Sequence, residues 1–405
     1  MGIIMKKIVA MSMAAVAVLN AASMDEAFVA GKAEGQIRAA YVSQDNEADQ
    51  DTYGTAIGGI VKYETAAWND IKLGIGAYVS QKLHFATGSF DEGKANADLF
   101  GENTKSYAYA GEAYLDYSAN DFNLRVGRQQ LDTPFADTDD IRMHPNTFEA
   151  AVASYRGIEG TTLVGGYMTR WAGYDSGSDI SKFKKPADGS NGVAIVGFMN
   201  ESVDNLAVQG WYYGADKFAD LYYADAAYTV GFGEEMGLEL NAQYAAFKED
   251  TQADGTKSGV DGNVYGIGAA FIAGPVTVGA AYNRGSNGEG KTPPIGFGGG
   301  PYVTSMEEWT IEGMEDVKAY QFSAEVDMGA AGVEGLSLSV LYGVFKSDPA
   351  AVKVRETDVI VAYAVNERLG VDASYARIQD GNDNAGEGGT DGGYSRFLVR
   401  MSYNF

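Results

Sequence analysis

Residues 107–117 form the stretch Tyr-Ala-Tyr-Ala-Gly-Glu-Ala-Tyr-Leu-Asp-Tyr, which shows the pattern that decides the fold. One alternate set of positions comprises Tyr107, Tyr109, Gly111, Ala113, Leu115 and Tyr117, and the other comprises Ala108, Ala110, Glu112, Tyr114 and Asp116. A period of two places the two sets on opposite faces of a β-strand. A tilted strand of about ten residues is long enough to cross a bilayer. The stretch therefore predicts an amphipathic membrane-spanning strand whose first set faces lipid.

The same alternation recurs along the chain, as at 71–78, 238–244 and 320–326, and about 18 such stretches can be placed between residues 33 and 405. The connections after even-numbered stretches are short, whereas most connections after odd-numbered stretches are long and polar. The longest are 83–104, 172–190, 285–317 and 380–393. Short turns at one end and long loops at the other are typical of outer-membrane barrels. We therefore predict an all-β protein, a transmembrane antiparallel β-barrel of about 18 strands over residues 23–405.

Composition narrows the function classes further. The 405 residues include 30 Lys and Arg against 55 Asp and Glu, a net charge of −25, so nucleic acid is not expected as a partner. The absence of cysteine excludes disulfides and thiolate metal sites. The two histidines, His84 and His144, have no recognisable nucleophile motif nearby. We expect no catalytic activity, no cofactor and no metal site.

Both ends of the chain indicate export. Residues 5–7 are Met-Lys-Lys, residues 8–19 are apolar except for Ser12, and small residues follow, which predicts a signal peptide over residues 1–22. The alternative is a buried N-terminal helix. At the other end an alternating stretch closes on Phe405, which resembles the signal recognised by the outer-membrane barrel-assembly machinery. We expect a multi-pass barrel in the outer membrane of a Gram-negative bacterium, in contact with its lipid and lipopolysaccharide.

If the apolar set of each strand faces lipid, the alternate set lines the interior. The basic interior positions are Arg38, Lys72, Arg125, Arg170, Arg396 and Arg400. The acidic interior positions are Asp225, Glu239, Glu325, Asp358 and Asp372. A basic wall opposite an acidic wall would create a field that orients charged solutes. The alternative is that these side chains are merely solvated or paired in a wet lumen, and a one-residue slip would reverse each assignment.

The third long connection, 131–146, is a candidate constriction. It contains Asp132, Asp137, Asp139, Asp140, Arg142 and His144. Side chains alone do not fill the lumen of a 16- to 18-stranded barrel, so another element has to narrow it. We expect this loop to fold inward and to present its acids to the wall arginines. His144 either titrates and modulates conductance or simply makes a hydrogen bond within its loop.

The sequence around this loop resembles the OprD-type outer-membrane porins. The resemblance lies in 124–134 (Leu-Arg-Val-Gly-Arg-Gln-Gln-Leu-Asp-Thr-Pro), 139–143 (Asp-Asp-Ile-Arg-Met) and 145–149 (Pro-Asn-Thr-Phe-Glu). Residues 24–41 are similar to family members of the epsilonproteobacterial kind. The resemblance implies an 18-stranded porin with an inward third loop and a ladder of arginines, which passes small, often carboxylate-bearing solutes.

Within that resemblance, Arg125 and Arg128 match the arginine-bearing strand before the loop, and Arg142 matches the basic residue within it. The alternation places Arg128 on the lipid face unless the strand ends or bulges there. The resemblance does not identify the solute.

We therefore expect a passive diffusion channel for small hydrophilic solutes, amino acids or carboxylates among them. A homotrimer is expected because many 16- and 18-stranded porins assemble so. The alternative function is a surface adhesin or structural barrel, which loop-specific binding that survives plugging of the channel would reveal. Residues 380–384 resemble the start of a calcium loop, but Ala385 stands where that loop requires glycine, so a solvated acidic loop is favoured.

Overall fold

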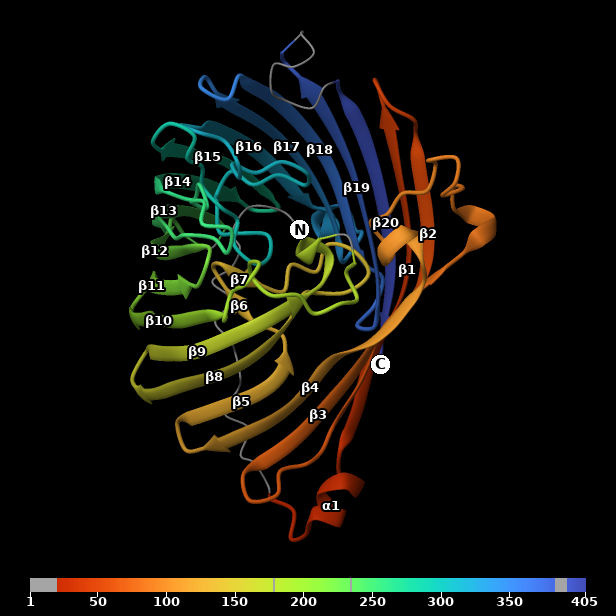
Figure 1. The fold of residues 1–405 in the computed structure, drawn as a ribbon, viewed down its shortest axis with the longest axis vertical. Coiled ribbons are helices and arrows are strands. Elements are labelled where there is room, and N and C mark those ends of the chain that lie inside the picture. Colours follow the sequence, from red (N-terminus) through yellow and green to blue (C-terminus); the bar gives the residue numbers. More distant parts are fainter. Residues whose placement is uncertain (1–19, 178, 234, 383–391) are drawn as a thin grey trace.

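The computed structural model describes residues 20–177, 179–233, 235–382 and 392–405. Within these ranges, eighteen strands form one antiparallel sheet (Figure 1). They are β1 Lys32–Asn46, β2 Thr52–Glu64, β3 Ile71–Lys82, β4 Tyr107–Ala119, β5 Phe122–Gln129, β8 Thr147–Ile158, β9 Thr161–Ala172, β10 Val193–Val203, β11 Leu206–Ala215, β12 Ala219–Gly231, β13 Met236–Glu249, β14 Gly262–Ala273, β15 Val276–Ser286, β16 Lys318–Asp327, β17 Leu336–Ser347, β18 Val352–Ala364, β19 Leu369–Asp380 and β20 Tyr394–Asn404. The remaining elements are short: α1 Met24–Val29, β6 Asp132–Thr133, β7 Ala136–Asp137, and the 3-10 helices His84–Ala86, Glu102–Thr104, Tyr174–Ser176 and Met328–Ala331.

The sheet closes on itself because β1 pairs with both β2 and β20. The closing register runs from Gln36 opposite Asn404 to Asn46 opposite Tyr394. Closure lets the backbone N–H and C=O groups of the first and last strands form hydrogen bonds with each other. Within the hydrocarbon of a bilayer these groups would have no other partners. The predicted 18-stranded all-β barrel is confirmed.

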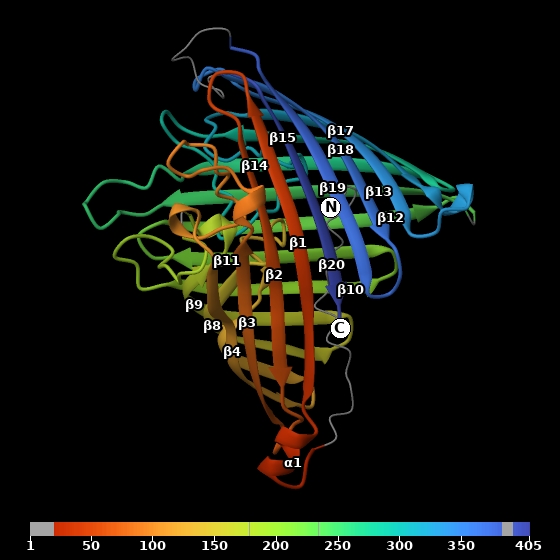
Figure 2. The same ribbon diagram turned by 90° about the vertical axis from the view of Figure 1, so that its right-hand side faces the viewer.

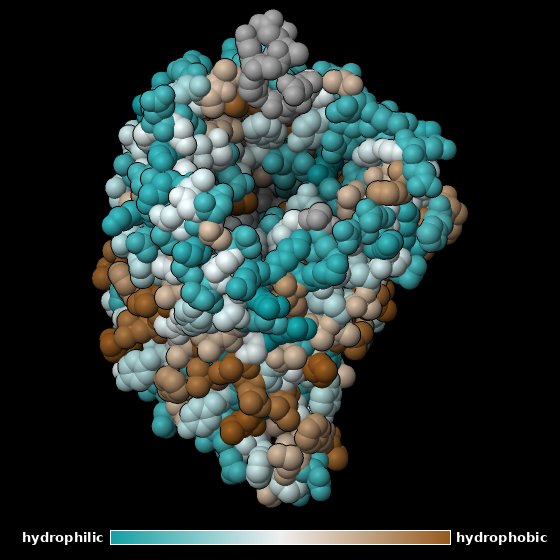
Figure 3. Space-filling model, viewed as in Figure 1, coloured by the Kyte–Doolittle hydropathy of each residue, from teal (hydrophilic) through white to brown (hydrophobic). Residues whose placement is uncertain are grey.

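The two faces of the wall differ in polarity as the alternation predicts. On β1, Ile37 and Tyr41 are 51% and 37% exposed on the outside, whereas Arg38 between them is 4% exposed toward the interior. Outward residues of β3 follow the same rule, since Ile71, Leu73 and Ile75 are exposed. Figure 3 shows hydrophobic side chains gathered in the lower half of the view, over β5, β8 and β9.

The predicted segregation of loop lengths is also seen. Short turns such as that between β4 and β5 lie at the same end of the barrel as α1, and the long connections project from the other end (Figure 2). Asn120 and Asn205 take positive φ in two of the short turns, a conformation that asparagine tolerates. In outer-membrane barrels the short turns are periplasmic and the long loops are extracellular.

The prediction that Tyr107 and Tyr109 face lipid is wrong. A β-bulge in β4 makes Gly76 face Glu112 while Ala77 faces Ala110, so that Gly111 is the extra residue. Beyond the bulge the alternation is reversed. Tyr107 and Tyr109 therefore face the interior, where their rings contact His144, instead of the lipid.

Among the described residues, no helix is long and apolar enough to span a membrane. The predicted signal peptide, apart from residues 20–22, lies outside the described residues. So does the acidic loop from residue 383 to residue 391.

Candidate pore constriction

Three wall arginines reach the lumen side by side from the closing strand pair. Arg38 lies on β1, and Arg396 and Arg400 lie on β20. Ser402 is the register partner of Arg38, and its Oγ accepts a 3.0 Å hydrogen bond from Arg38 Nε. Because Arg396, Arg400 and Ser402 differ by even numbers of residues, they share the inner face of one strand.

The loop between β5 and β8 crosses the lumen, with the β6–β7 hairpin at its tip inside the barrel (Figure 1). On one side Phe135 packs edge-on against Tyr213, Tyr223 and Phe247 of β11, β12 and β13, with ring centroids 5.6, 5.9 and 6.0 Å away. On the other side Asp140 reaches Arg38. These contacts confirm the predicted inward fold of residues 131–146.

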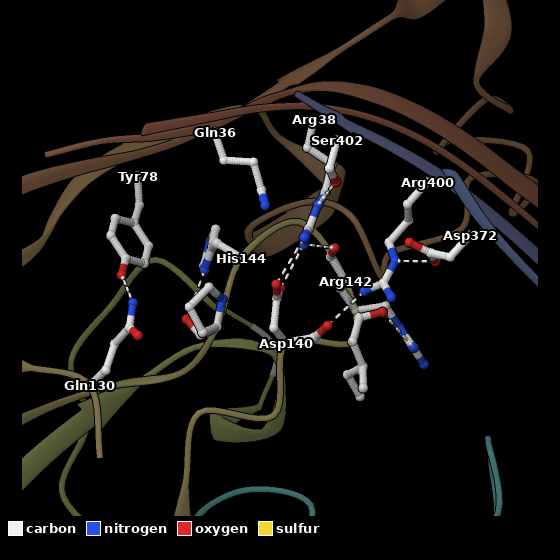
Figure 4. Close-up of polar contacts among 12 residues, drawn as sticks. Gln36, Arg38, Tyr78, Gln130, Asp140, Arg142, His144, Asp372, Arg400 and Ser402 are labelled. Carbon is white, nitrogen blue, oxygen red and sulfur yellow. Dashed lines mark hydrogen bonds and ion pairs between the residues drawn. The ribbon is translucent and has the colours of Figure 1, made fainter. Parts of the chain in front are cut away.

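Asp140 binds the arginine wall through both carboxylate oxygens (Figure 4). Arg38 Nη1 donates to Oδ1 at 2.6 Å, and Arg38 Nη2 donates to Oδ2 at 2.8 Å. Arg38 also donates to the carbonyl oxygen of Arg142 at 2.8 Å, and Arg400 donates to that of Asp140 at 2.7 Å. Burial raises the pKa of Asp140, but the hydrogen bonds and charge of Arg38 outweigh it, so the pKa lies below its usual range.

A second charge cluster joins three loops to the same wall. Arg396 pairs with Glu308 at 2.8 Å and with Asp98, and Arg142 lies 3.5 Å from each of these carboxylates. The Arg142 guanidinium also stacks on the Tyr174 ring at 4.3 Å. Burial, with the neighbouring charges of Glu307 and Asp358, raises the pKa of Glu308 to about 7 against the lowering effect of Arg142.

Sequence reasoning did not identify Asp98 and Glu308, which come from the connections before β4 and before β16. The second connection is anchored inside the barrel, because the backbone N–H groups of Glu308 and Trp309 each donate to the Glu356 carboxylate at 2.9 Å. The composition of the connection before β16 indicated that it would be buried. Six of its large apolar residues are buried, which is unusual for a solvated loop: Phe297, Tyr302, Met306, Ile311, Met314 and Val317.

Two other predicted basic residues also face the lumen, toward the short-turn end. Lys72 pairs with Glu64 at 2.9 Å, and Arg125 pairs with Asp116 at 2.7 Å. Arg125 also lies 4.2 Å from the Tyr114 ring centroid. Each of these cations therefore has an acidic partner on its own side of the barrel.

Two of the other predicted loop acids make hydrogen bonds within the loop. Asp132 accepts a hydrogen bond from Thr138, and Asp137 accepts one from the backbone of Asp139. His144 is buried, its Nε2 2.6 Å from the Tyr107 hydroxyl. Burial lowers the pKa of His144 to about 4.

The prediction that Arg128 and Arg170 line the pore is wrong. Arg128 lies opposite Ala113 and Glu149, on the outward-facing set. A bulge in β9 sets Ala150 opposite Met168 but Glu149 opposite Arg170, so that Thr169 and Arg170 both turn outward. The bulge resolves a packing conflict, because Met168 and Trp171 both belong to the buried interior cluster although they are three residues apart.

The predicted division into a basic and an acidic wall is not what the contacts show. Asp372 pairs with Arg400 at 2.8 Å, beside the arginines rather than opposite them. The other predicted acids have polar neighbours: Asp225 accepts from Gln209 and Tyr223, Glu325 from Ser339, and Asp358 from the backbone of Glu307. Glu239 lies opposite Thr229 of β12 and Ala270 of β14. The interpretation of paired charges in a wet lumen is favoured.

The formal charges of the eight side chains that pair at the constriction balance. Four cations, Arg38, Arg142, Arg396 and Arg400, lie among four carboxylates, Asp98, Asp140, Glu308 and Asp372. Water reaches this ring, since the side chains of Asp140 and Asp372 are 38% and 37% exposed. A single charge substitution therefore changes the net charge of these eight paired groups by one unit.

Comparison with known proteins agrees with this architecture. The family model for outer membrane porins of the OprD family matches residues 26–384. Pseudomonas aeruginosa OccK9 (OpdG) is 17% identical, with a TM-score of 0.77 over 94% of this chain and 99% of that chain. P. aeruginosa OpdQ is 20% identical, with a TM-score of 0.75 over 93% and 98%. P. aeruginosa OpdK, solved with vanillate, is 17% identical, with a TM-score of 0.77 over 93% and 98%.

No curated protein matches the chain. The family model nevertheless covers most of its length, and the closed 18-stranded barrel is the fold of these solved channels. The barrel places the protein in the outer membrane of a Gram-negative bacterium as a passive channel. The chain belongs to the OprD family of outer membrane porins.

Proposed function

We propose that the channel passes small hydrophilic solutes, with carboxylates and amino acids among them, and that the loop 131–146 sets its selectivity. The observation that carries the proposal is the bidentate contact of Asp140 with Arg38 inside a charge-balanced ring reached by water. A solute carrying both charges would find a partner for each on this ring. The related channel OpdK was solved with vanillate, a carboxylate.

Arg400 is the cation that we propose as the first contact for a solute carboxylate. Its contacts among the described residues use Nε, to Asp372, and Nη1, to the carbonyl oxygen of Asp140. Guanidinium has five N–H donors, so Nη2 retains the capacity to bind a passing carboxylate. Asp372 and Asp140 would then release that solute by competing for the same cation.

The test is solute entry into liposomes that contain the refolded protein, followed as swelling rates. A zwitterionic amino acid, a monocarboxylate, a diamine of similar size and a neutral sugar are compared. The proposal expects the amino acid and the carboxylate to enter faster than the diamine, and Arg400→Gln to remove that preference while sugar entry persists. Equal entry of all four solutes would contradict selectivity, and a folded protein that admits none would contradict the diffusion function.

We also propose how the barrel reaches its place. Residues 1–22 would direct export, and the strand ending in Phe405 would be recognised during assembly. Phe405 is 47% exposed, and its backbone pairs with Gly35. Phe405→Ala should lower the amount of barrel in the outer membrane, measured by fractionation, without altering the conductance of protein refolded in vitro. Chemical cross-linking of that membrane fraction would test the expected homotrimer.

A further inference from the structure

A groove of about 410 Å³ lies on the outer wall toward the long-loop end of the barrel. It is lined by residues of four adjacent strands: Ala113, Val126, Gly127, Arg128, Glu149, Ala150, Ala151, Tyr167 and Thr169. Its floor consists mainly of small and apolar residues. Val126 and Tyr167 are 45% and 44% exposed on the outer surface, so the groove opens toward lipid rather than toward the pore.

Charged residues stand at the extracellular edge of this groove. Arg128 pairs with Glu149 at 3.0 Å, and Arg170 lies 3.9 Å from the same carboxylate. One acid thus serves two cations, and the Arg170 side chain is 51% exposed. All three residues lie within three positions of a strand end at the long-loop side.

A basic segment of the loop after β9 folds over the rim beside these residues, where Phe183 also packs against the interior Tyr109. Residues 182–185 are Lys-Phe-Lys-Lys, a dense basic run in a chain whose net charge is −25. The Arg128 guanidinium lies 4.2 Å from the Phe183 ring centroid, a cation–π contact that holds the segment against the wall.

The backbone of this segment is fixed as well. Lys184 and Trp171 exchange two backbone hydrogen bonds, of 2.8 and 2.9 Å, in an antiparallel bridge. That bridge brings the next residues, Lys185 and Arg170, beside each other, and both are exposed. Their positive charge is therefore presented at the top of the groove.

The cations at the outer edge of the groove outnumber the acid that pairs with them. The cations are Arg128, Arg170 and Lys185, and the acid is Glu149. Three cations against one acid leave these four side chains with a net charge of +2 on a strongly acidic protein. An anionic group is the complementary ligand for such a patch.

We propose that this patch and the groove below it bind one lipopolysaccharide molecule of the outer leaflet, with a lipid A phosphate at Arg170 and Lys185 and an acyl chain along the groove. Lipid A presents phosphates directly above acyl chains, and the wall presents cations directly above an apolar groove. The patch lies at the long-loop end of the barrel, and this end faces the outer leaflet because the long loops are extracellular. A second copy of the chain is the alternative occupant, which the groove variant below tests.

The experiment measures lipid retention by the full-length barrel in detergent with native mass spectrometry. The probes are diphosphorylated lipid A and the same lipid after phosphatase treatment. Wild type should bind the diphosphorylated form more tightly, and Arg170→Gln combined with Lys185→Gln should weaken that binding by about tenfold. Arg156→Gln combined with Arg368→Gln, at the short-turn end, is the charge-matched control and should bind like wild type.

A second variant tests the groove separately from the charge. Ala151→Phe fills the groove and should reduce binding of both forms of lipid A, while the preference for phosphate persists. Equal binding of the two forms by wild type would overturn the proposal, as would wild-type affinity in the double variant. Loss of oligomers in Ala151→Phe without a change in lipid binding would also overturn it, because a second copy would then cover the groove. Heat-modifiable gel mobility and unchanged conductance establish that each variant is folded.

Discussion

Replacing Asp140 by Asn tests whether a charge-balanced ring sets ion selectivity. The substitution keeps the size of the side chain but changes the formal charge of the ring from zero to +1. An ion that passes about 5 Å from this position gains or loses about 0.8 kcal/mol in water, reduced to about 0.5 kcal/mol by screening in 0.1 M salt. That energy changes the local concentration of each ion about twofold, so the anion-to-cation permeability ratio should rise about fivefold.

The assay is the reversal potential of the refolded channel in a planar bilayer under a salt gradient. Arg38→Gln is the reciprocal variant, because it breaks the same contact but removes a positive charge. Both variants lose the bidentate link between loop and wall, at a cost of about 2 kcal/mol, since Asp140 is partly exposed and Arg38 is buried. Both should therefore loosen residues 131–146 to a similar extent, seen as more current noise.

Selectivity separates the two variants, since Asp140→Asn should favour anions and Arg38→Gln should favour cations. Asp372→Asn serves as a control, because it removes a negative charge from the wall while the bidentate contact between Asp140 and Arg38 stays in place. It should shift selectivity toward anions while the noise stays low. If Asp140→Asn and Arg38→Gln shift the reversal potential in the same direction, loop displacement rather than charge governs selectivity, and the reasoning is refuted.

Three further predictions concern protonation and packing. Because the pKa of Glu308 is about 7, lowering the pH from 8 to 6 should protonate it and shift the reversal potential toward anions, and Glu308→Gln should reduce that shift. The pKa of His144 falls from 6.5 to about 4 on folding, so its contribution to the stability of the fold is present above pH 6.5 and is lost as the pH falls toward 4. This loss of about 3 kcal/mol should appear as faster proteolysis within residues 131–146 at pH 4.5. The His144→Gln variant should not show this acceleration. A Cβ at Gly111 would lie 2.6 Å from Tyr78 Cγ, so Gly111→Leu should lower the urea midpoint by an amount equivalent to about 1–3 kcal/mol, whereas Gly165→Ala, with nothing within 4 Å, should leave it unchanged.

Local pattern was enough to predict the barrel and its third loop. A period of two fixes which residues can share a face, and the lipid requires one face to be apolar, so strands such as β1 and β20 were identified from their own residues. Loop 131–146 is identified as a constriction because side chains alone do not fill so wide a lumen, and because its acids can meet the wall arginines that are visible in the sequence. Asp140 and Arg38 do meet, although 102 positions separate them.

Tertiary structure decided the direction of several side chains and the partners of the ring. Arg170 lies outside, and Tyr107 and Tyr109 inside, because bulges and register depend on what neighbouring strands must bury. Arg128 lies outside as its own alternation indicated, against the role that the family resemblance implied. Asp98 and Glu308 joined the ring because separate loops fold back into the lumen, and no local period encodes where a long loop lands. Alternation is a property of consecutive residues, whereas a bulge or an ion pair between loops is settled by packing among segments that are distant in the chain.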